Sequence, residues 1–248
     1  MWIETRGGNA MDMEFYELQS PSLKELFVRQ MESMILSGKL PIGTKLPTER
    51  ELSEKMNVSR AVVNGGLSEM EAKGFLQVIP RKGTYVADYK YTGKLDILKS
   101  IMEYNNADFE PEMLQSLAQV RKDIISTCYP MAALNRRDED LECLESYLLG
   151  MENPCDNTDI AELSFKFEHV LCIASGNVVY PLIYYSFKPM IISFSKKYLA
   201  RSGKKGKEES LSVIRRIFES IKNQEPDEAR EMAIQFINLG TNVLGYKL

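Results

Sequence analysis

Histidine is almost absent from this sequence, which has a single one, His169, among 248 residues. No two of its four cysteines have the spacing of metal ligands; they are Cys128, Cys143, Cys155 and Cys172. A structural zinc ion needs several imidazole or thiolate ligands that converge on one point. We therefore expect no metal and no other cofactor, and we expect the cysteines to be free thiols.

Long apolar runs are also missing. No part of the sequence approaches the roughly 20 apolar residues that a membrane-spanning helix needs. The first twenty residues contain acidic side chains and no continuous apolar stretch, unlike a secretory signal. We therefore expect a cytoplasmic protein without a membrane partner, beginning with a flexible tail over residues 1–20.

Catalytic patterns are scarce as well. The sequence has no glycine-rich phosphate loop, and no Ser-His-Asp set can be built with confidence around one histidine. No pair of carboxylates stands out from the surface charge. We predict no catalytic residue.

The clearest local pattern is a pair of capped helices joined by a short turn. Thr48 is followed three residues later by Glu51, a capping box that satisfies the free amides of a helix start. Asn57-Val58 is a turn pair just long enough to swing the chain into a second helix, which Ser59 caps. Gly74 suits the left-handed position after the end of that helix. This arrangement is a helix-turn-helix, which indicates DNA binding.

The amino end of the second helix carries the side chains that would read DNA. A recognition helix contacts base edges with its first residues, which here are Arg60, Ala61 and Asn64. Arginine binds guanine and asparagine binds adenine, each with two hydrogen bonds. Downstream, the strand patterns Phe75–Ile79 and Thr84–Ala87 predict a hairpin, or wing. Its tip contains two cations and a glycine, which are Arg81, Lys82 and Gly83.

A third helix opens upstream with the capping box of Ser22 and Glu25 and is closed by Gly38. Three helices and a hairpin make a winged helix-turn-helix domain over residues 21–88. This region has ten Lys and Arg against eight Asp and Glu, a net charge of +2; because the whole chain carries −4, the rest carries −6. Attraction to phosphates should therefore concentrate at a few cations. These are Arg50, Arg60, Arg81 and Lys82.

Three linked segments of this domain resemble the GntR family of bacterial transcription regulators. They are Gly38-Lys39-Leu40-Pro41-Ile42-Gly43-Thr44-Lys45-Leu46-Pro47-Thr48-Glu49-Arg50, Val58-Ser59-Arg60 and Lys82-Gly83-Thr84-Tyr85-Val86. The resemblance implies a homodimer on a short palindromic operator of double-stranded DNA. It gives Arg50 and Arg60 the roles of the family's DNA-contacting arginines and places Gly83 near the minor groove. Ser59 and Ala61 belong to the same predicted interface.

Two features depart from the family pattern. Many relatives carry arginine where this chain has Asn64, so the operator half-site is expected to differ. Gly65 and Gly66 stand inside the recognition helix, where each glycine costs about 1 kcal/mol relative to alanine. Either close packing on the first helix requires their small size, or the helix orders fully only on DNA. Strong amide protection of residues 67–70 in the free protein would exclude the second explanation.

After the wing, the pattern changes to helices alone. Residues 89–108 are interpreted as a linker with one short helix, and residues 109–248 show helical periodicity almost throughout. We expect Asp108 to cap the first helix of this domain and Pro189 to kink the helix of residues 178–201. Several antiparallel helices joined by short turns form a bundle. The predicted fold is therefore mainly α, with a winged helix-turn-helix followed by an all-α bundle.

The bundle resembles the effector-binding domain of the FadR subfamily of GntR regulators. Phe167 with Ala174-Ser175-Gly176-Asn177 matches a segment of many members, and Arg121 falls where an arginine faces the effector cavity. In the metal-binding form of the domain, one aspartate and three histidines hold the ion. Glu168 and Phe236 occupy two of those ligand positions here, which again predicts no structural metal. A hard cation bound by Asp123 and Glu168 stays an alternative.

The resemblance implies a ligand-responsive regulator, expected to be a repressor that an organic acid, a sugar acid or an acyl-CoA-like effector releases from DNA. The predicted effector site comprises Arg121, Glu168, Asn177 and Tyr184, and the planar guanidinium of Arg121 would pair with a carboxylate or phosphate. The alternatives are an architectural DNA-binding protein without an effector and a small-molecule enzyme with a DNA-binding head. Arg60 and Asn64, at the reading end of the helix, disfavour the architectural alternative.

Two patterns in the bundle each have two interpretations. The aromatic and methionine side chains of Tyr180–Tyr198 either line an apolar channel or belong to an ordinary core. The basic run Lys196–Lys207 either meets phosphates or is a solvated helix end.

Overall fold

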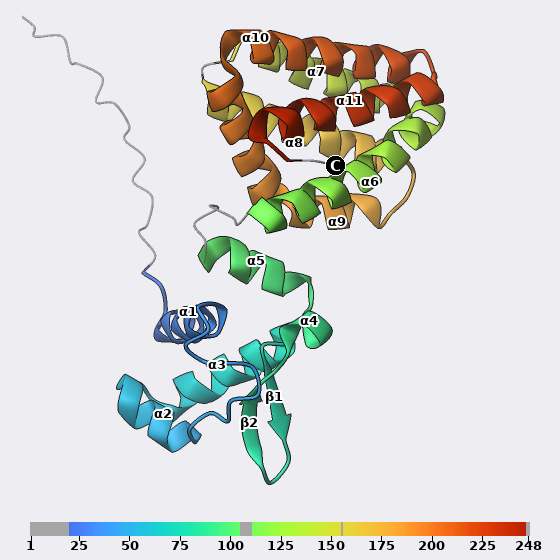
Figure 1. Ribbon diagram of the computed structural model, residues 1–248. Coiled ribbons are helices and arrows are strands. Elements are labelled where there is room, and N and C mark those ends of the chain that lie inside the picture. Colours follow the sequence, from blue (N-terminus) through green and yellow to red (C-terminus); the bar gives the residue numbers. More distant parts are fainter. Residues whose placement is uncertain (1–19, 105–110, 155, 247–248) are drawn as a thin grey trace, which may run out of the picture. The chain divides into compact units, whose positions relative to one another are not determined.

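The computed structural model describes residues 20–104, 111–154 and 156–246 of the chain (Figure 1). Residues 1–19 of the predicted tail, the predicted helix cap Asp108 and Cys155 lie outside these residues. The chain divides into two compact units between Thr92 and Gly93. Helices dominate, and the two units have the architectures predicted from the sequence, a winged helix-turn-helix and an all-α bundle.

The first unit consists of three helices and a two-stranded hairpin. They are α1 (Leu23–Leu36), α2 (Glu49–Met56), α3 (Arg60–Lys73), β1 (Leu76–Ile79) and β2 (Gly83–Val86). The strands are antiparallel, with Leu76 opposite Val86 and Ile79 opposite Gly83. The order of three helices followed by a wing confirms the predicted winged helix-turn-helix.

The helix boundaries of this unit follow from its capping side chains. The Thr48 hydroxyl accepts a hydrogen bond from the amide of Glu51 (3.3 Å), and the Glu51 carboxylate accepts one from the amide of Thr48 (2.7 Å). Ser22 and Glu25 form the same reciprocal pair at the start of α1. Beyond α3, Gly74 has a φ of 93°, the left-handed conformation that glycine adopts without strain. These local hydrogen bonds confirm the predicted ends of the helices.

Helix α3 packs closely on α1 because Gly66, which has no side chain, lets the two helices approach each other. A Cβ atom placed on Gly66 would lie 2.3 Å from Cδ1 of the buried Phe27 ring, so no larger residue fits without a shift. Two ion pairs join the same helices, Lys24 to Glu69 and Lys73 to Glu32, each at 2.9 Å. At Gly66, the structure therefore supports packing as the reason for the glycine.

Alanine substitutions at the two glycines are expected to act in opposite directions. Gly66→Ala should lower the free energy of unfolding by about 1–3 kcal/mol, because the added methyl group overpacks against Phe27. Gly65→Ala should raise it by up to about 1 kcal/mol, because alanine favours a helix and its Cβ would meet only the flexible Lys24 side chain, at 3.4 Å. Thermal unfolding followed by circular dichroism measures both. Equal effects of the two variants would contradict the packing explanation.

Residues after the wing form two helices, where the sequence analysis expected one. Helix α4 (Tyr89–Thr92) packs on the first unit, since the Thr92 hydroxyl donates to the carbonyl oxygen of Gly74 at 2.9 Å. Helix α5 (Leu95–Tyr104) belongs to the second unit and packs on its core through Leu98 and Ile101.

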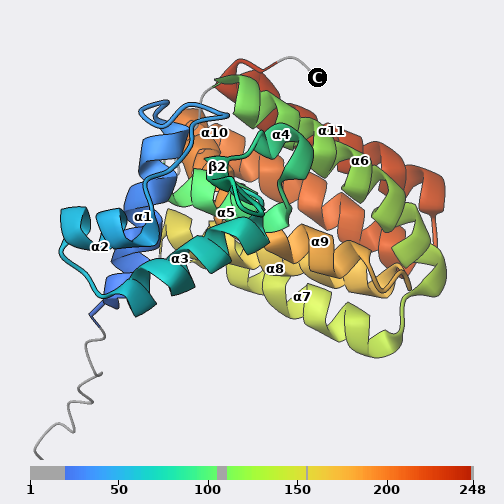
Figure 2. The same cartoon turned by 90° about the horizontal axis from the view of Figure 1, so that it is seen from below.

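The remaining helices of the second unit form the bundle. They are α6 (Pro111–Asn135), α7 (Asp138–Glu152), α8 (Asn157–Ala174), α9 (Tyr180–Ser186), α10 (Lys188–Lys222) and α11 (Pro226–Leu244). Helices α6 and α11 lie side by side in both views, α10 packs on α11, and α7 packs on α8 (Figures 1 and 2). The core between them contains fully buried aromatic side chains, among them Tyr129, Phe165, Phe167 and Tyr184. Cys128 and Cys172 are buried free thiols, and Cys143 is an exposed one.

The predicted kinked helix over residues 178–201 is wrong. The chain forms two helices there, because α9 ends at Ser186 and Pro189 stands in the first turn of α10. Proline is favoured in a first helical turn, where its missing amide costs no hydrogen bond. Proline thus helps to start a new helix here and does not bend an existing one.

Helix α10 has a break of its own at Gly203. This residue has a φ of 62° and a ψ of −158°, a region of backbone conformation that is essentially restricted to glycine. Across the break, the Tyr198 hydroxyl donates to the carbonyl oxygen of Gly206 at 2.8 Å. The two halves of α10 therefore meet at a fixed bend.

Candidate DNA interface and effector pocket

The amino end of α3, which the sequence predicts to read DNA, is capped and open to solvent. The Ser59 hydroxyl accepts a hydrogen bond from the amide of Val62 at 3.3 Å, which fixes the first turn. Arg60, Ala61 and Asn64 are exposed. Within the described part of the chain, Arg60 has no ion pair or hydrogen bond from its side chain, so its guanidinium is available to bases and phosphates.

Asn64 does have a partner, which the sequence did not predict. Its side-chain amide donates to the Glu49 carboxylate at the start of α2, at 3.1 Å. An asparagine that reads adenine needs both its amide and its carbonyl group. To bind a base in this way, Asn64 would have to break its hydrogen bond to Glu49 and form hydrogen bonds to the base instead.

Arg50 and the wing extend the exposed cations beyond α3. The Arg50 side chain is 69% exposed and lies 3.6 Å from the Glu54 carboxylate one turn along α2. Arg81 and Lys82 are exposed at the tip of the hairpin, and Arg81 has a φ of 64°. Gly83 has a φ of 119°, so the predicted glycine stands where the backbone of the turn favours it.

Lys45 is a cation of this surface that the sequence analysis missed. Its backbone pairs with Tyr85 of β2, and its Cε would lie 2.9 Å from a Cβ atom placed on Gly83. Lys45 is exposed, so its ammonium group adds to the charge of Arg81 and Lys82 at the wing. Lys45 lies at the wing because its backbone pairs with Tyr85, 40 residues later in the sequence, and no local sequence pattern predicts that pairing.

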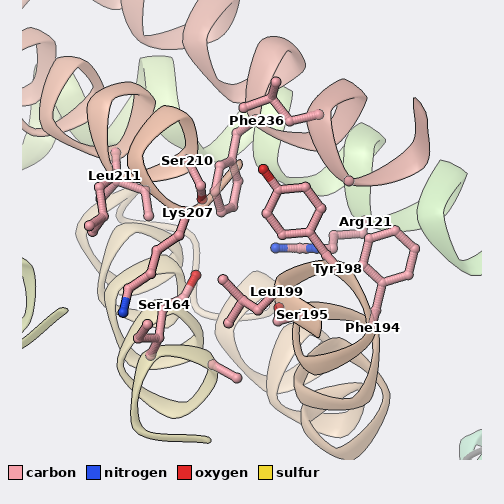
Figure 3. Close-up of a pocket in the computed structure, with 15 residues that line it drawn as sticks. Arg121, Ser164, Phe194, Ser195, Tyr198, Leu199, Lys207, Ser210, Leu211 and Phe236 are labelled. Carbon is pink, nitrogen blue, oxygen red and sulfur yellow. The ribbon is translucent and has the colours of Figure 1, made fainter. Parts of the chain in front are cut away.

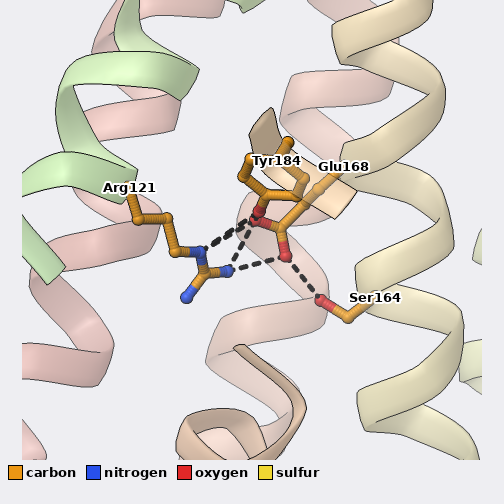
Figure 4. Close-up of polar contacts among 4 residues, drawn as sticks. All are labelled: Arg121, Ser164, Glu168 and Tyr184. Atoms are coloured by element: carbon orange, nitrogen blue, oxygen red, sulfur yellow. Dashed lines mark hydrogen bonds and ion pairs between the residues drawn. The ribbon is translucent and has the colours of Figure 1, made fainter. Parts of the chain in front are cut away.

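A polar cluster lies inside the bundle, where Arg121 of α6 meets Glu168 of α8 (Figure 4). Nη2 of Arg121 donates to both carboxylate oxygens at 2.6 Å, and Nε donates to one of them at 3.1 Å. Tyr184 of α9 donates its hydroxyl proton to Glu168, and Ser164 donates to it at 3.3 Å. The structure thus brings together three of the four residues that the sequence predicted for the effector site.

Burial governs the electrostatics of this cluster. It acts to lower the pKa of Arg121, but the charge and hydrogen bonds of Glu168 outweigh it, and the pKa of Arg121 is raised above its ordinary value. Burial, followed by the charge of Glu168, raises the pKa of Tyr184 well above its ordinary value. Arg121 is therefore cationic, Tyr184 is a neutral donor, and the arginine charge is balanced within the protein.

A small cavity of about 30 Å³ opens beside Arg121 between α8, α10 and α11 (Figure 3). Its walls are largely apolar, with Phe194, Tyr198, Leu199 and Phe236 among them. The Phe236 ring lies 5.5 Å from the Arg121 guanidinium carbon, which is cation-π distance. The cavity has room for about two water molecules.

Asn177, the fourth predicted effector residue, is not at this cavity. Its side-chain oxygen accepts hydrogen bonds from the amides of Val179 (2.9 Å) and Tyr180 (3.3 Å), so it shapes the turn before α9. A contact between Asn177 and an effector stays a prediction. Asparagine commonly forms such local turns with its own backbone, and the sequence pattern did not separate that role from ligand binding.

Potential metal ligands are also apart. Asp123 is exposed and accepts a hydrogen bond from Gln119, whereas Glu168 is buried against Arg121, so the alternative of a shared hard cation is not supported. His169 stacks on Phe165 and lies 3.2 Å from the carbonyl oxygen of Pro181, and burial lowers its pKa. Among the described residues, no three His, Cys, Asp or Glu side chains form a group that could hold a metal ion.

Known proteins resemble both units. Residues 24–86 match the family described as bacterial regulatory proteins, gntR family, and residues 116–239 match the FCD domain. The fatty acid metabolism regulator protein of Shewanella pealeana is 32% identical over 166 residues, which cover 67% of this chain and 68% of the relative. The protein of the same name from Proteus mirabilis is 30% identical over 183 residues, which cover 74% of each.

A solved structure agrees with these matches at the level of fold. It is described by the words "Lar controls the expression of the Listeria monocytogenes agr system and mediates virulence", and it aligns with 93% of this chain and 100% of its own at a TM-score of 0.61 and 15% identity. Among the described residues, no helix is both long and apolar enough to span a membrane. The names of the matched family and of these relatives describe regulators. The chain belongs to the GntR family of bacterial transcription regulators, and it joins the family's DNA-binding winged helix-turn-helix to a helical, FadR-like FCD domain.

Proposed function

We propose that this DNA-binding regulator is a cytoplasmic repressor that binds a palindromic operator as a homodimer and leaves it when an effector enters the bundle. The observation that carries the proposal is Arg60 at the capped amino end of α3, which is exposed and has no partner for its side chain among the described residues. A second copy is needed because a palindrome presents the same half-site twice, and two-fold symmetry supplies two reading heads.

The predicted DNA contacts form two groups with different roles. Arg60, Ala61 and Asn64 would read base edges in the major groove, with Ser59 holding the first turn. Arg50, Arg81 and Lys82 would neutralise phosphates, and Gly83 would let the wing tip approach the minor groove. Because such phosphate contacts release bound cations from DNA, binding should weaken steeply with salt.

The effector would act by enlarging a small pocket. A cavity of about 30 Å³ is too small for a metabolite, so any effector has to separate α10 from the helices around it. A ligand that binds only this open form shifts the protein towards it. If the open form holds the two reading heads at a spacing that misses the operator, binding of the effector releases DNA.

Effectors of three classes would match the chemistry of the polar and apolar side chains that line the pocket. These are an organic acid, a sugar acid and an acyl-CoA-like molecule, and the names of the relatives, regulators of fatty acid metabolism, favour the last. Arg121 would meet the effector through Nη1, which has no partner among the described residues, while Glu168 and Tyr184 hold its other nitrogen atoms.

Selection from a random DNA library tests this proposal. The bound sequences are expected to contain a palindrome, and citrate, gluconate or decanoyl-coenzyme A is expected to weaken binding to it at least fivefold, within the usual range of allosteric coupling. Fluorescence anisotropy measures that affinity, and calorimetry shows which compound binds. Absence of a palindrome, or a bound compound that leaves the affinity unchanged, would contradict the proposal and favour an architectural DNA binder. In a transcription assay, an increase in transcript would contradict repression.

A further inference from the structure

One lysine of the basic run Lys196–Lys207 lines the cavity of the bundle. Lys196, Lys204 and Lys205 are exposed, as the solvated interpretation of the run predicts. Lys197 and Lys207 are half-buried, and of the lysines in this run Lys207 is the one that lines the cavity beside Arg121. Figure 3 shows Lys207 and Arg121 on different sides of this cavity.

The bend in α10 explains why this position faces inward. Gly203 interrupts the helix four residues before Lys207, and the bond from Tyr198 to the Gly206 carbonyl oxygen fixes the geometry of the break. Ser210 follows Lys207 by three residues, which places both side chains on one face of a helix, and it lines the same cavity. Lys207 and Ser210 therefore line the same wall of the cavity.

The charge of the cavity comes from Lys207 and not from Arg121. Glu168 already balances the Arg121 guanidinium through contacts of 2.6 Å. No acidic side chain lines the cavity, and within the described parts of the chain no carboxylate pairs with Lys207. An anion beside Arg121 would meet the negative charge of Glu168, whereas an anion beside Lys207 would meet an uncompensated cation.

We propose that Lys207 binds the anionic group of the effector, with Ser210 as a second donor, and that Arg121 offers only a hydrogen bond from Nη1 at the other side. The proposal rests on the effector-binding function proposed above and names the class of molecule: an amphipathic organic anion. Its apolar body lies against Phe194, Leu199 and Phe236. Carboxylate and phosphate both suit an ammonium group, so either can supply the charge.

Three six-carbon probes test the role of the charge. Hexanoate and hexyl phosphate share an apolar chain but differ in the anion, and hexanol lacks the charge. Calorimetry on the full-length protein is expected to show that at least one anion binds more tightly than hexanol, by about tenfold to a hundredfold, the usual effect of a hydrogen bond to a charged group. The stronger of the two anions identifies a carboxylate or a phosphate as the preferred group.

Variants at Lys207 locate the contact. Lys207→Gln is expected to abolish the preference for the anions over hexanol, and Lys207→Arg to keep most of it. Lys205→Gln, a matched control at an exposed position of the same run, is expected to bind as the wild type does. Failure of both anions to bind the wild type more tightly than hexanol, or unchanged anion binding by Lys207→Gln, would overturn the proposal. Operator affinity without any probe, measured in parallel, reports separately on the DNA-binding function.

Discussion

A Glu168→Leu variant is expected to lose about 3–5 kcal/mol of the free energy of unfolding of the helical unit, the usual cost of leaving a buried charge without its partner. The Arg121 side chain is only 10% exposed, and its guanidinium cannot shed its proton at accessible pH. Two contacts of 2.6 Å to the Glu168 carboxylate now offset the cost of burying it. Urea unfolding followed by circular dichroism measures the loss.

Two further variants separate this effect from ordinary packing. The double variant Arg121→Met/Glu168→Leu removes both charges and is expected to recover most of the lost stability, because apolar residues often replace a buried ion pair without cost. Glu162→Leu, on the same helix, breaks a partly exposed pair with Lys188 and is expected to cost less than about 1 kcal/mol. If Glu168→Leu lost no more of the free energy of unfolding than Glu162→Leu, the buried charge of Arg121 would not need the Glu168 carboxylate to stabilise it.

An Arg60→Ala variant is expected to bind the operator about tenfold to a hundredfold less tightly, a loss of roughly 1–3 kcal/mol for one base contact. Its effect should depend on sequence, because discrimination at the contacted base pair disappears with the guanidinium. Lys82→Ala, at the wing, should instead weaken binding to all sequences alike and lower the salt dependence, since it removes a phosphate contact. Anisotropy titrations at several salt concentrations distinguish the two patterns.

A matched control accompanies this experiment. Arg230 of α11 is exposed in the other unit, and Arg230→Ala should leave operator affinity unchanged. Wild-type affinity and base preference in Arg60→Ala would show that the amino end of α3 does not read DNA.

The first unit could be predicted almost to its ends because its signals are local. Thr48 and Glu51, three residues apart, exchange hydrogen bonds, so the sequence alone reports the helix start. The break before α10 was mispredicted because Pro189 fits both a kinked helix and the first turn of a new one. Packing of distant segments decides between these outcomes, and periodicity does not contain that information.

The pocket was harder to predict because its residues lie far apart in the sequence. Arg121 and Glu168 are separated by 47 residues, and only the family resemblance linked them. Even the resemblance could not show that Arg121 and Glu168 pair with each other, because their pairing depends on the distance between α6 and α8. In the sequence, Lys207 could not be told apart from the exposed lysines beside it. The bend at Gly203 that places it at the cavity changes neither the charge pattern nor the hydropathy pattern of the run.

The bend at Gly203 also constrains chirality at that position. No atom lies within 4 Å of where a Cβ would stand, so a side chain has room there, and only the handedness of an L-residue opposes it. The mirror image of a φ of 62° and a ψ of −158° is the extended, polyproline-like conformation that L-residues favour. A D-amino acid introduced by chemical synthesis would therefore suit this backbone conformation better than any L-residue does.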